Sequence, residues 1–422
     1  MERVFRGRRG AGELDYVCAW FEKASEFVQG TSIRCALVAT NSIVQGEQVP
    51  ILWSPMLGRG IRIDFAHRTF RWTSEAIGKA VVHVVIVGFS ENGLRNQKLL
   101  FDYDNAAGDA HELVVSEINP YLLDAPAWII PVARRTPVSP DAPRASFGSM
   151  PNDDGNLILE REARERLLEL DPGAAPFVRP LIGAKGMLQG RARWCLWLPG
   201  VEPNELRRHP FVMQRIEAVK TYREASSRKQ TKELAKTPSL FGEIRQPDEA
   251  YLCLPRHPSQ NRRAVPMAFF SRDDIAHDST LAVAGATGYE FGILSSAMFT
   301  AWLRTVGGRI KSDLRISVEN VLNTFPWPDP TPKQRASVEG AAQAVLAARD
   351  GHPQSTLADL YDPLAMPREL SGAHDALDRA VDAAYRSQSF PGDLERVSFI
   401  FNRYAEISGL MAEQLASTPN IG

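Results

Sequence analysis

The sequence lacks the features that mark membrane, secreted and zinc-binding proteins. No run of eighteen apolar residues occurs among its 422 residues, and the first ten, MERVFRGRRG, have no apolar signal-peptide core. The cysteines lie far apart, without the close pairing that zinc sites require. We therefore expect a cytoplasmic protein with no membrane partner, no metal site and four reduced cysteines in its core: Cys18, Cys35, Cys195 and Cys253.

Catalytic motifs are also absent. The sequence has no Gly-rich phosphate loop, no HExxH, no CxxC and no GxSxG. Its eight histidines are scattered, and His83, at the centre of an apolar run, is interpreted as a core residue rather than as a ligand or base. The net charge of −1 gives no global basic signal, so evidence for a polyanionic partner must come from the local distribution of charge.

The length and the ordinary balance of 44% apolar and 23% charged residues predict two or three domains. Helical spacing over residues 15–28 predicts a helix with Asp15 as its N-cap. Short strands are expected at 33–38, 61–65 and 81–89, with a helix at 45–57 between the first two. The apolar residues that share the buried face of the first helix are Val17, Trp20, Phe21, Ala24, Phe27 and Val28.

The strand expected at 81–89 is apolar on both faces, which is typical of a strand in the middle of a covered sheet. No strand is expected before residue 33. These elements therefore predict an α/β sheet that contains only its last strands. A peripheral hairpin is expected within 90–118, and the proline-rich stretch that follows predicts a domain boundary near 125–148.

The connection between the strands at 61–65 and 81–89 is longer than most hairpin loops and is rich in aromatic and basic residues. It contains His67, Arg68, Phe70, Arg71, Trp72, Glu75 and Lys79. We expect it to project over a binding surface. The alternative is that Phe70 and Trp72 fill a local core.

Two later segments carry local charge. Residues 207–236 contain nine Lys or Arg against three Glu within a helical pattern, as expected either for contacts to phosphates or for a solvated helix face. Residues 307–327 are basic and polar at their start, and such side chains either read base edges or form an ordinary surface turn. After FPWPDPTP, helices are expected at 333–350, 370–386 and 394–416.

Several separate segments of the sequence resemble one family along nearly the whole chain. They are GELDYVCAWFEKASEF, RCALVATNSIVQGEQV, FAHRTFRWTSEAIGKAVVHVVIVGF, FGSMPNDDGNLIL, RWCLWL, TPSLFGEIRQP and FPWPDPTP. In this order they are similar to the MmeI-like DNA methyltransferases of bacterial restriction-modification systems. The resemblance implies the end of a class I methyltransferase domain at 1–125, a target-recognition domain of α+β type at 126–330 and a helical C-terminal domain at 331–422.

The family transfers a methyl group from S-adenosylmethionine to the N6 amine of adenine in duplex DNA. Its Gly-rich cofactor motif and its Asn-Pro-Pro-Phe/Tyr motif precede the region that our chain resembles, and neither Asn-Pro-Pro-Phe nor Asn-Pro-Pro-Tyr occurs in this sequence. The resemblance therefore implies S-adenosylmethionine in the complete enzyme. For this chain alone we expect no bound cofactor and no activity.

The resemblance also suggests roles for individual residues. Phe70 or Trp72 is expected to stack on an adenine flipped out of the duplex, with Arg68, Arg71 and Lys79 at the DNA backbone. Lys311 and Asp313 are expected to read one G·C pair, with Arg309 and Arg315 as further DNA-binding residues. Exchanging Lys311 and Asp313 for a different charged pair is therefore expected to change the methylated sequence while leaving overall affinity similar.

These observations lead to a principal hypothesis, the DNA-recognising segment of a site-specific adenine-N6 methyltransferase that flips adenine. The alternative is a standalone sequence-specific DNA-binding module or a subunit that complements a separately encoded N-terminal half. A protein–protein scaffold, suggested by the helical tail, is a third option. Salt-dependent binding to duplex DNA separates the first two from the third.

Overall fold

The computed structural model describes residues 1–72, 82–93, 97–103, 107–310 and 313–410. The chain divides into two compact units. The first unit consists of Met1–Ala142, Ala301–Pro328 and Gln388–Gly422, and the second of Pro143–Thr300 and Asp329–Ser387. The segment around 301–328 therefore groups with the N-terminal region, although more than 150 residues separate them in the sequence.

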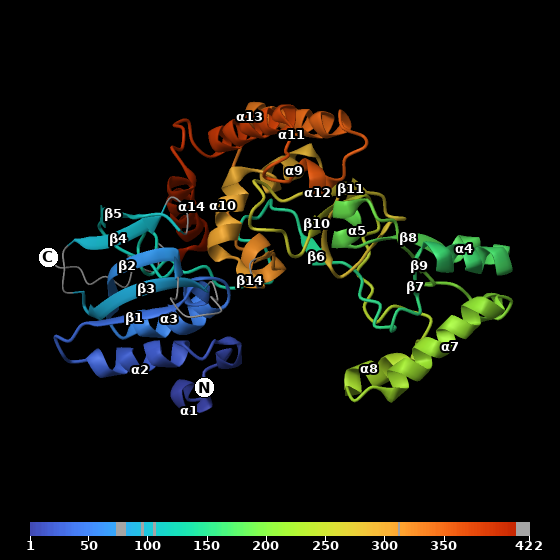
Figure 1. Cartoon of the computed structure of the whole chain (residues 1–422), viewed down its shortest axis with the longest axis horizontal. Coiled ribbons are helices and arrows are strands. Elements are labelled where there is room, and N and C mark those ends of the chain that lie inside the picture. Colours follow the sequence, from blue (N-terminus) through green and yellow to red (C-terminus); the bar gives the residue numbers. More distant parts are fainter. Residues whose placement is uncertain (73–81, 94–96, 104–106, 311–312, 411–422) are drawn as a thin grey trace. The chain divides into compact units, whose positions relative to one another are not determined.

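The first unit contains a mixed five-stranded sheet in the order β1-β3-β2-β4-β5 (Figure 1). β3 lies between β1 and β2 and runs antiparallel to both, whereas β4 is parallel to β2 and antiparallel to β5. The predicted inner position of the third strand and the predicted peripheral hairpin, β4 and β5, are thus confirmed. The strands are β1 (Cys35–Thr40), β2 (Ile61–Trp72), β3 (Val82–Glu91), β4 (Lys98–Tyr103) and β5 (Ala110–Val115).

Helices α2 (Cys18–Val28) and α3 (Gln48–Gly58) provide the core on one face of this sheet. Phe21 of α2 stacks on Phe89 of β3 with 5.9 Å between ring centroids, and it meets Trp53 of α3 edge-on. The Trp53 indole N–H donates to the Ile43 carbonyl at 2.9 Å, so the large ring is buried without an unpaired donor. The short helices α1 (Glu2–Phe5), η1 (Ala11–Glu13) and η2 (Asn41–Val44) complete this region.

The buried face of α2 differs from the predicted one. Glu22 is buried because Arg8 and Arg59 donate to its carboxylate at 2.8 and 2.9 Å. Burial alone would raise the pKa of Glu22, but these two guanidinium groups outweigh it and lower that pKa. Turning Glu22 inward rotates the helix, so Trp20 and Phe27 are 59% and 70% exposed. The helix also begins at Cys18, with Val17 instead of Asp15 at the N-cap.

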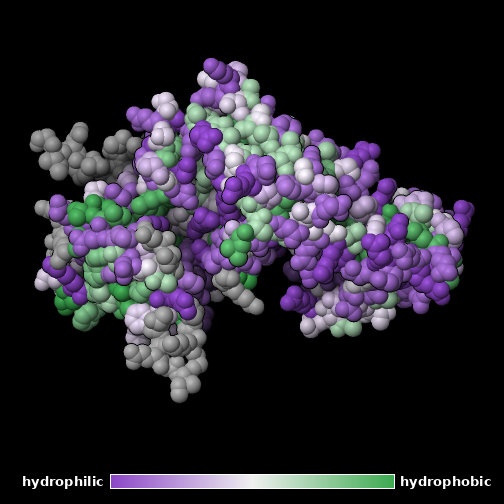
Figure 2. Space-filling view, turned by 45° about the horizontal axis from the view of Figure 1, so that its top comes forward, coloured by the Kyte–Doolittle hydropathy of each residue, from purple (hydrophilic) through white to green (hydrophobic). Residues whose placement is uncertain are grey.

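The opposite face of the sheet is apolar and partly open to solvent. A cavity of about 370 Å³ is lined there by Phe65, Gly88, Leu99 and Phe101 among others. Val38 of the edge strand β1 is 49% exposed. Figure 2 shows apolar patches on the portion of the molecule where Figure 1 places β1–β5. Among the described residues, this face is therefore apolar without being fully covered.

The structure corrects two further predictions, which concern Cys35 and His83. Cys18, Cys195 and Cys253 are buried free thiols as expected, but Cys35 on β1 is only half-buried. His83, expected in the core, is exposed because it lies near the start of β3, beyond the part of the strand that α2 and α3 pack against.

The remaining elements of the first unit surround Trp302, which is fully buried on α10 (Ala297–Val306). Its ring packs against Phe401 of α14 (Asp393–Ser408), and its indole N–H donates to the Val321 carbonyl at 3.2 Å. The chain continues from α10 into the hairpin strands β14 (Gly308–Ile310) and β15 (Asp313–Arg315) and then into the π-helical turn η5 (Val318–Leu322). These three elements belong to the first unit.

The second unit contains two four-stranded sheets, in the orders β11-β10-β13-β6 and β12-β8-β9-β7. The predicted helices near 333–350 and 370–386 are confirmed. The strands are β6 (Ala145–Phe147), β7 (Ile158–Leu159), β8 (Val178–Ile182), β9 (Trp194–Leu196), β10 (Tyr251–Pro255), β11 (Ala268–Phe270), β12 (Ile275–Ala276) and β13 (Thr280–Ala284). The helices are α4 (Arg161–Leu170), η3 (Pro172–Phe177), α5 (Ala184–Gln189), α6 (Pro203–Leu206), α7 (Pro210–Ala225), α8 (Lys229–Glu233), η4 (Leu234–Lys236), α9 (Gly288–Leu294), α11 (Pro332–Asp350), α12 (Leu357–Leu360) and α13 (Arg368–Tyr385).

Among the residues that the structure describes, no helix is both long enough and apolar enough to span a bilayer.

Candidate functional site

Residues 66–72, the described part of the aromatic and basic segment, belong to a strand, whereas the sequence predicted that the strand ends at 65. β2 continues to Trp72 because β3 pairs with it along its whole described length, as Phe70 faces Val84 and Trp72 faces Val82. A bulge between His67 and Phe70 interrupts the register. Bulges re-aim side chains near functional sites, and here the bulge contains Arg68 and Thr69.

Aromatic rings form a ladder at this end of the sheet. The His67 imidazole stacks on Phe101 with 4.2 Å between centroids, and Phe70 stacks on Tyr103 at 5.2 Å. Trp72 lies 6.2 Å from Phe70 and is 47% exposed. Phe70 is half-buried and Trp72 is exposed, so neither ring fills a closed local core.

His67 joins two rings of the ladder, those of Phe101 and Tyr103. Its Nδ1 lies 2.8 Å from the Tyr103 hydroxyl, and burial lowers the pKa of the imidazole. A neutral imidazole stacked on Phe101 and hydrogen-bonded to Tyr103 holds both rings in place. Phe70, which stacks on Tyr103, therefore rests on a rigid support.

The predicted basic residues near the ladder have different surroundings. Arg68 donates to the Asp102 carboxylate at 2.9 Å, whereas Arg71 is exposed opposite His83. Lys79 and Glu75 lie outside the described residues.

A cavity of about 280 Å³ lies beside the bulge, within the first unit. It brings together Arg68 and Arg309, which the sequence proposed separately, with Arg304, which it did not propose. Asp102 is the carboxylate among the described lining residues, and it pairs with Arg68. The other lining residues are Val44, Gln45, Thr69, Tyr103, Tyr121, Leu122 and Thr305.

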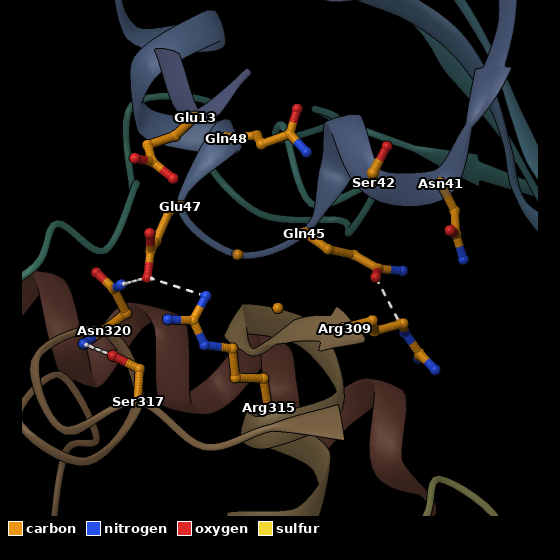
Figure 3. A pocket seen from close by; sticks show the side chains of 12 residues that line it. Glu13, Asn41, Ser42, Gln45, Glu47, Gln48, Arg309, Arg315, Ser317 and Asn320 are labelled. Atoms are coloured by element: carbon orange, nitrogen blue, oxygen red, sulfur yellow. Dashed lines mark hydrogen bonds and ion pairs between the residues drawn. The ribbon is translucent and has the colours of Figure 1, made fainter. Parts of the chain in front are cut away.

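The hairpin of β14 and β15 is attached to the segment that follows β1. Arg309 Nε donates to the Gln45 side-chain oxygen at 2.9 Å, and the Asn320 amide donates to Glu47 at 2.7 Å (Figure 3). Arg315 lies 4.0 Å from the same Glu47 carboxylate. These contacts line a polar pocket of about 250 Å³.

Close backbone approach makes this attachment tight. Gly46 has a φ of +60°, and a Cβ placed on it would lie 2.8 Å from the Gly308 Cα. Only glycine fits such a position without displacing the hairpin. Sequence periodicity did not indicate Gln45, Gly46 and Glu47, because their role depends on residues far away in the chain.

Of the predicted reading residues, Asp313 starts β15 and is half-buried, and Lys311 lies outside the described residues. Arg309 and Arg315 both make contacts within the first unit. Among the described residues, no cluster of His, Cys, Asp or Glu has the arrangement of a metal site.

Comparison with known proteins assigns most of the chain to one family. Its family models match consecutive segments: the MmeI DNA-methyltransferase domain at residues 1–102, the MmeI target recognition domain at 124–329 and the MmeI C-terminal domain at 330–412. The chain belongs to the MmeI-like DNA methyltransferases. The α/β sheet followed by a recognition region and C-terminal helices agrees with the fold that the sequence predicted.

Two members of the family are similar over most of this chain. DNA methyltransferase A of Bacillus subtilis (strain 168) is 35% identical over 408 residues, covering 97% of this chain and 45% of that protein. The type IIL restriction-modification enzyme MmeI, solved in complex with DNA, is 40% identical with a TM-score of 0.87, covering 97% of this chain and 54% of that one. The chain thus spans about half the length of the family members it matches.

Proposed function

We propose that this chain is the DNA-holding and target-reading part of an adenine-N6 methyltransferase of a restriction-modification system. The observation that carries this proposal is the aromatic ladder at the end of β2, with cationic side chains beside it. A base outside the duplex is recognised by stacking on aromatic rings, and the neighbouring backbone by cations. The similarity to MmeI, which was solved with DNA, supports double-stranded DNA as the partner.

In this proposal the side chains bind and orient, and none acts as a nucleophile. S-adenosylmethionine would be held elsewhere in the complete enzyme, where it would supply a methyl group. Phe70 or Trp72 holds and orients the extruded base. The ladder gives Phe70 a supported face and leaves Trp72 accessible, and both remain candidates for the stacking ring.

The residues of this chain do not fit a site for S-adenosylmethionine. The sequence has no Gly-rich phosphate loop and no Asn-Pro-Pro-Phe or Asn-Pro-Pro-Tyr. We propose that a methyltransferase half, on a separate chain or a preceding segment, carries the cofactor. Its support is the sheet, where β1 forms one edge and one apolar face is partly open.

Recognition of the target sequence is assigned to the hairpin of β14 and β15. Lys311 and Asp313 remain the proposed reading pair. Arg309 and Arg315 already contact Gln45 and Glu47 through part of their guanidinium groups, so they connect the hairpin to the ladder region as well as contributing positive charge. Arg71 and Lys79 remain proposed contacts to the DNA backbone.

The test is methylation by this chain combined with a family half that carries the cofactor motifs. We expect N6-methyladenine in duplex DNA, detected by mass spectrometry. Replacing the stacking ring by alanine, in Phe70→Ala or Trp72→Ala, should weaken catalysis by about 1–3 kcal/mol. Phe70→Tyr and Trp72→Phe keep a ring and serve as matched controls that retain activity.

Wild-type activity in both alanine variants would rule out the stacking role. Absence of cofactor-dependent methylation, together with specific duplex binding, would instead favour the standalone DNA-binding module. The absence of the Asn-Pro-Pro-Phe/Tyr motif from this sequence is the observation that supports this alternative.

A further inference from the structure

The segment Asn41–Glu47, which we name the spacer, connects β1 to α3 in the first unit. It begins directly after the strand and ends directly before the helix, so regular structure fixes both of its ends. Ile43 and Val44 anchor its middle, since both side chains are buried. The Ile43 carbonyl also accepts the Trp53 indole N–H at 2.9 Å. The spacer is therefore held firmly within its unit.

The start of the spacer has a fixed position relative to the aromatic ladder. Thr40, the last residue of β1, pairs with Val84 of β3, and Val84 pairs with Phe70 of β2. Thr40 and Phe70 thus lie in one row across three neighbouring strands, roughly 10 Å apart by the usual strand spacing. The Asn41 amide also donates to the Thr69 hydroxyl of the bulge at 3.4 Å. The hydrogen bonds of the sheet therefore set the distance from the spacer to Phe70.

The end of the spacer is attached to the hairpin of β14 and β15 and to the turn that follows it. Three successive spacer residues make these contacts, which join Gln45 to Arg309, Gly46 to Gly308 and Glu47 to Asn320. Figure 3 shows Gln45 and Glu47 on one side of the polar pocket, facing the hairpin and turn on the other. The contact at Gly46 is backbone against backbone and leaves no room for a methyl group. The hairpin is therefore held in one position along the spacer.

These two attachments fix the distance between two parts of the bound DNA in the proposed function. A ring on β2 holds the extruded adenine, and the hairpin reads a base pair elsewhere in the duplex. Successive base pairs lie about 3.4 Å apart along the helix axis. A hairpin displaced by this distance would face a different pair. Recognition and methylation stay in register only if the spacer holds the hairpin more closely than that.

We propose that the spacer sets the number of base pairs between the pair that is read and the adenine that is methylated, with Gly46 and Glu47 as positioning residues. This inference deepens the proposed function and rests on it. Gly46 determines how closely the hairpin approaches, because a side chain there would push against Gly308. Glu47 holds the turn after the hairpin through Asn320. Neither residue touches the reacting amine in this role.

The experiment maps methylation on a pool of random-sequence duplex DNA. The full chain is combined with a family half that carries the cofactor motifs, and sequencing locates each N6-methyladenine and the bases preferred around it. For the wild type we expect a preferred base pair at a fixed distance from the methylated adenine. In Gly46→Ala the added Cβ displaces the hairpin. The preference at that pair should therefore fall by about tenfold, the discrimination of one bidentate base contact, or move to a neighbouring pair.

Gly30→Ala is the matched control for backbone strain. Gly30 has a similar φ of +69° in the same unit, but a Cβ placed on it would meet no atom within 4 Å. The variant therefore carries comparable strain without a clash against the hairpin. It should keep the preferred pair and its distance from the methylated adenine. An equal loss of preference in both glycine variants would mean that strain causes the effect, and it would overturn the role of the spacer.

Glu47 provides a second test, which decides the question even where Gly46→Ala fails to fold. Glu47→Ala removes the acceptor of the Asn320 amide and should weaken the preference. Glu47→Gln keeps a side-chain oxygen for that amide and should retain most of it. If the two variants lose the preference equally, Glu47 does not act through Asn320 and its assignment is wrong. Glu13→Ala removes a carboxylate that lines the same pocket, and it should leave the preference unchanged.

The outcomes separate the spacer from the proposed function. An unchanged preference and distance in Gly46→Ala and Glu47→Ala, with a clear preference in the wild type, overturns the spacer alone. A variant that only lowers the yield of N6-methyladenine at unchanged sites has a purely structural role, which also counts against the spacer. Absence of methylation by the wild type, or methylation without a preferred sequence, overturns the proposed function and the spacer with it.

Discussion

Lysine and arginine side chains have different surroundings in the two units. In the second unit they are dense in the sequence, yet Arg223 at the centre of the dense segment is fully buried and Arg215 donates to a backbone carbonyl. Others in that segment contact neighbours on the same helix or turn, as Lys236 does with Glu233. In the first unit, Arg68 is far in sequence from Arg304 and Arg309, yet all three line one cavity. Convergence in space therefore gathers cations that density along the chain does not reveal.

The largest expected effect concerns Arg223, which has a structural role. Its guanidinium donates to five backbone carbonyls, those of Pro151, Asn152, Leu234, Thr237 and Leu240, at 2.8–3.0 Å. Arg223→Ala would leave these buried acceptors unpaired, so we expect a loss of about 3–5 kcal/mol in the free energy of unfolding. Urea denaturation of wild type and variant measures this loss.

Arg208→Ala, an exposed cation just before the same helix, serves as the control and should change stability by less than about 0.5 kcal/mol. If the two variants are equally stable, Arg223 does not organise the turns around it. The contrast between buried and cavity-lining arginines would then fail.

The second expected effect concerns a buried histidine of the same unit. His374 Nε2 lies 2.8 Å from the Tyr361 hydroxyl, which also accepts from Arg349. Burial first, and then the charges of Arg349 and Arg263 against that of Asp375, lower the pKa of His374 to about 3. In the unfolded chain this histidine has an ordinary pKa of about 6.5 and is protonated below that pH. In the folded chain it stays neutral down to a pH of about 3.

The contribution of His374 to the free energy of unfolding is therefore fully present above pH 6.5, and it is lost as the pH falls toward 3. At pH 5 the loss should reach about 2 kcal/mol relative to pH 7. Urea denaturation at both pH values tests this for the wild type and His374→Gln, whose side chain keeps a polar group but does not titrate. If the unfolding free energies of the wild type and His374→Gln change with pH in the same way, the pKa of His374 is not lowered in the folded chain.

The sequence predicted the elements whose signals are local. The strands within 33–38, 61–65 and 81–89 follow from apolar runs, and the C-terminal helices from periodic spacing. The orientation of α2 could not be predicted, because it depends on Glu22 meeting Arg8 and Arg59 from outside the helix. The extension of β2 to Trp72 also depends on its partner strand.

In the candidate site, too, some residues could be predicted from the sequence and others could not. Phe70, Trp72, Arg68 and Arg309 were predicted individually, since residue type and family resemblance point to them. Arg304 was missed because a single arginine at the end of a helix is usually an ordinary favourable charge there. Its association with Arg68 arises only from folding.

The smallest expected effect concerns the exposed part of the charge-dense segment. Lys229 and Lys232 lie on α8 and are exposed. Because the dense segment is largely occupied by internal contacts, we expect Lys229→Gln with Lys232→Gln to change unfolding free energy by less than about 0.5 kcal/mol. The double variant should also alter the salt slope of duplex binding by less than about 0.9, the value for one lost phosphate contact. Titrations of the wild type and the double variant against one duplex at several salt concentrations measure this change, and a larger one would mean that charge density along the chain marks a DNA-binding surface.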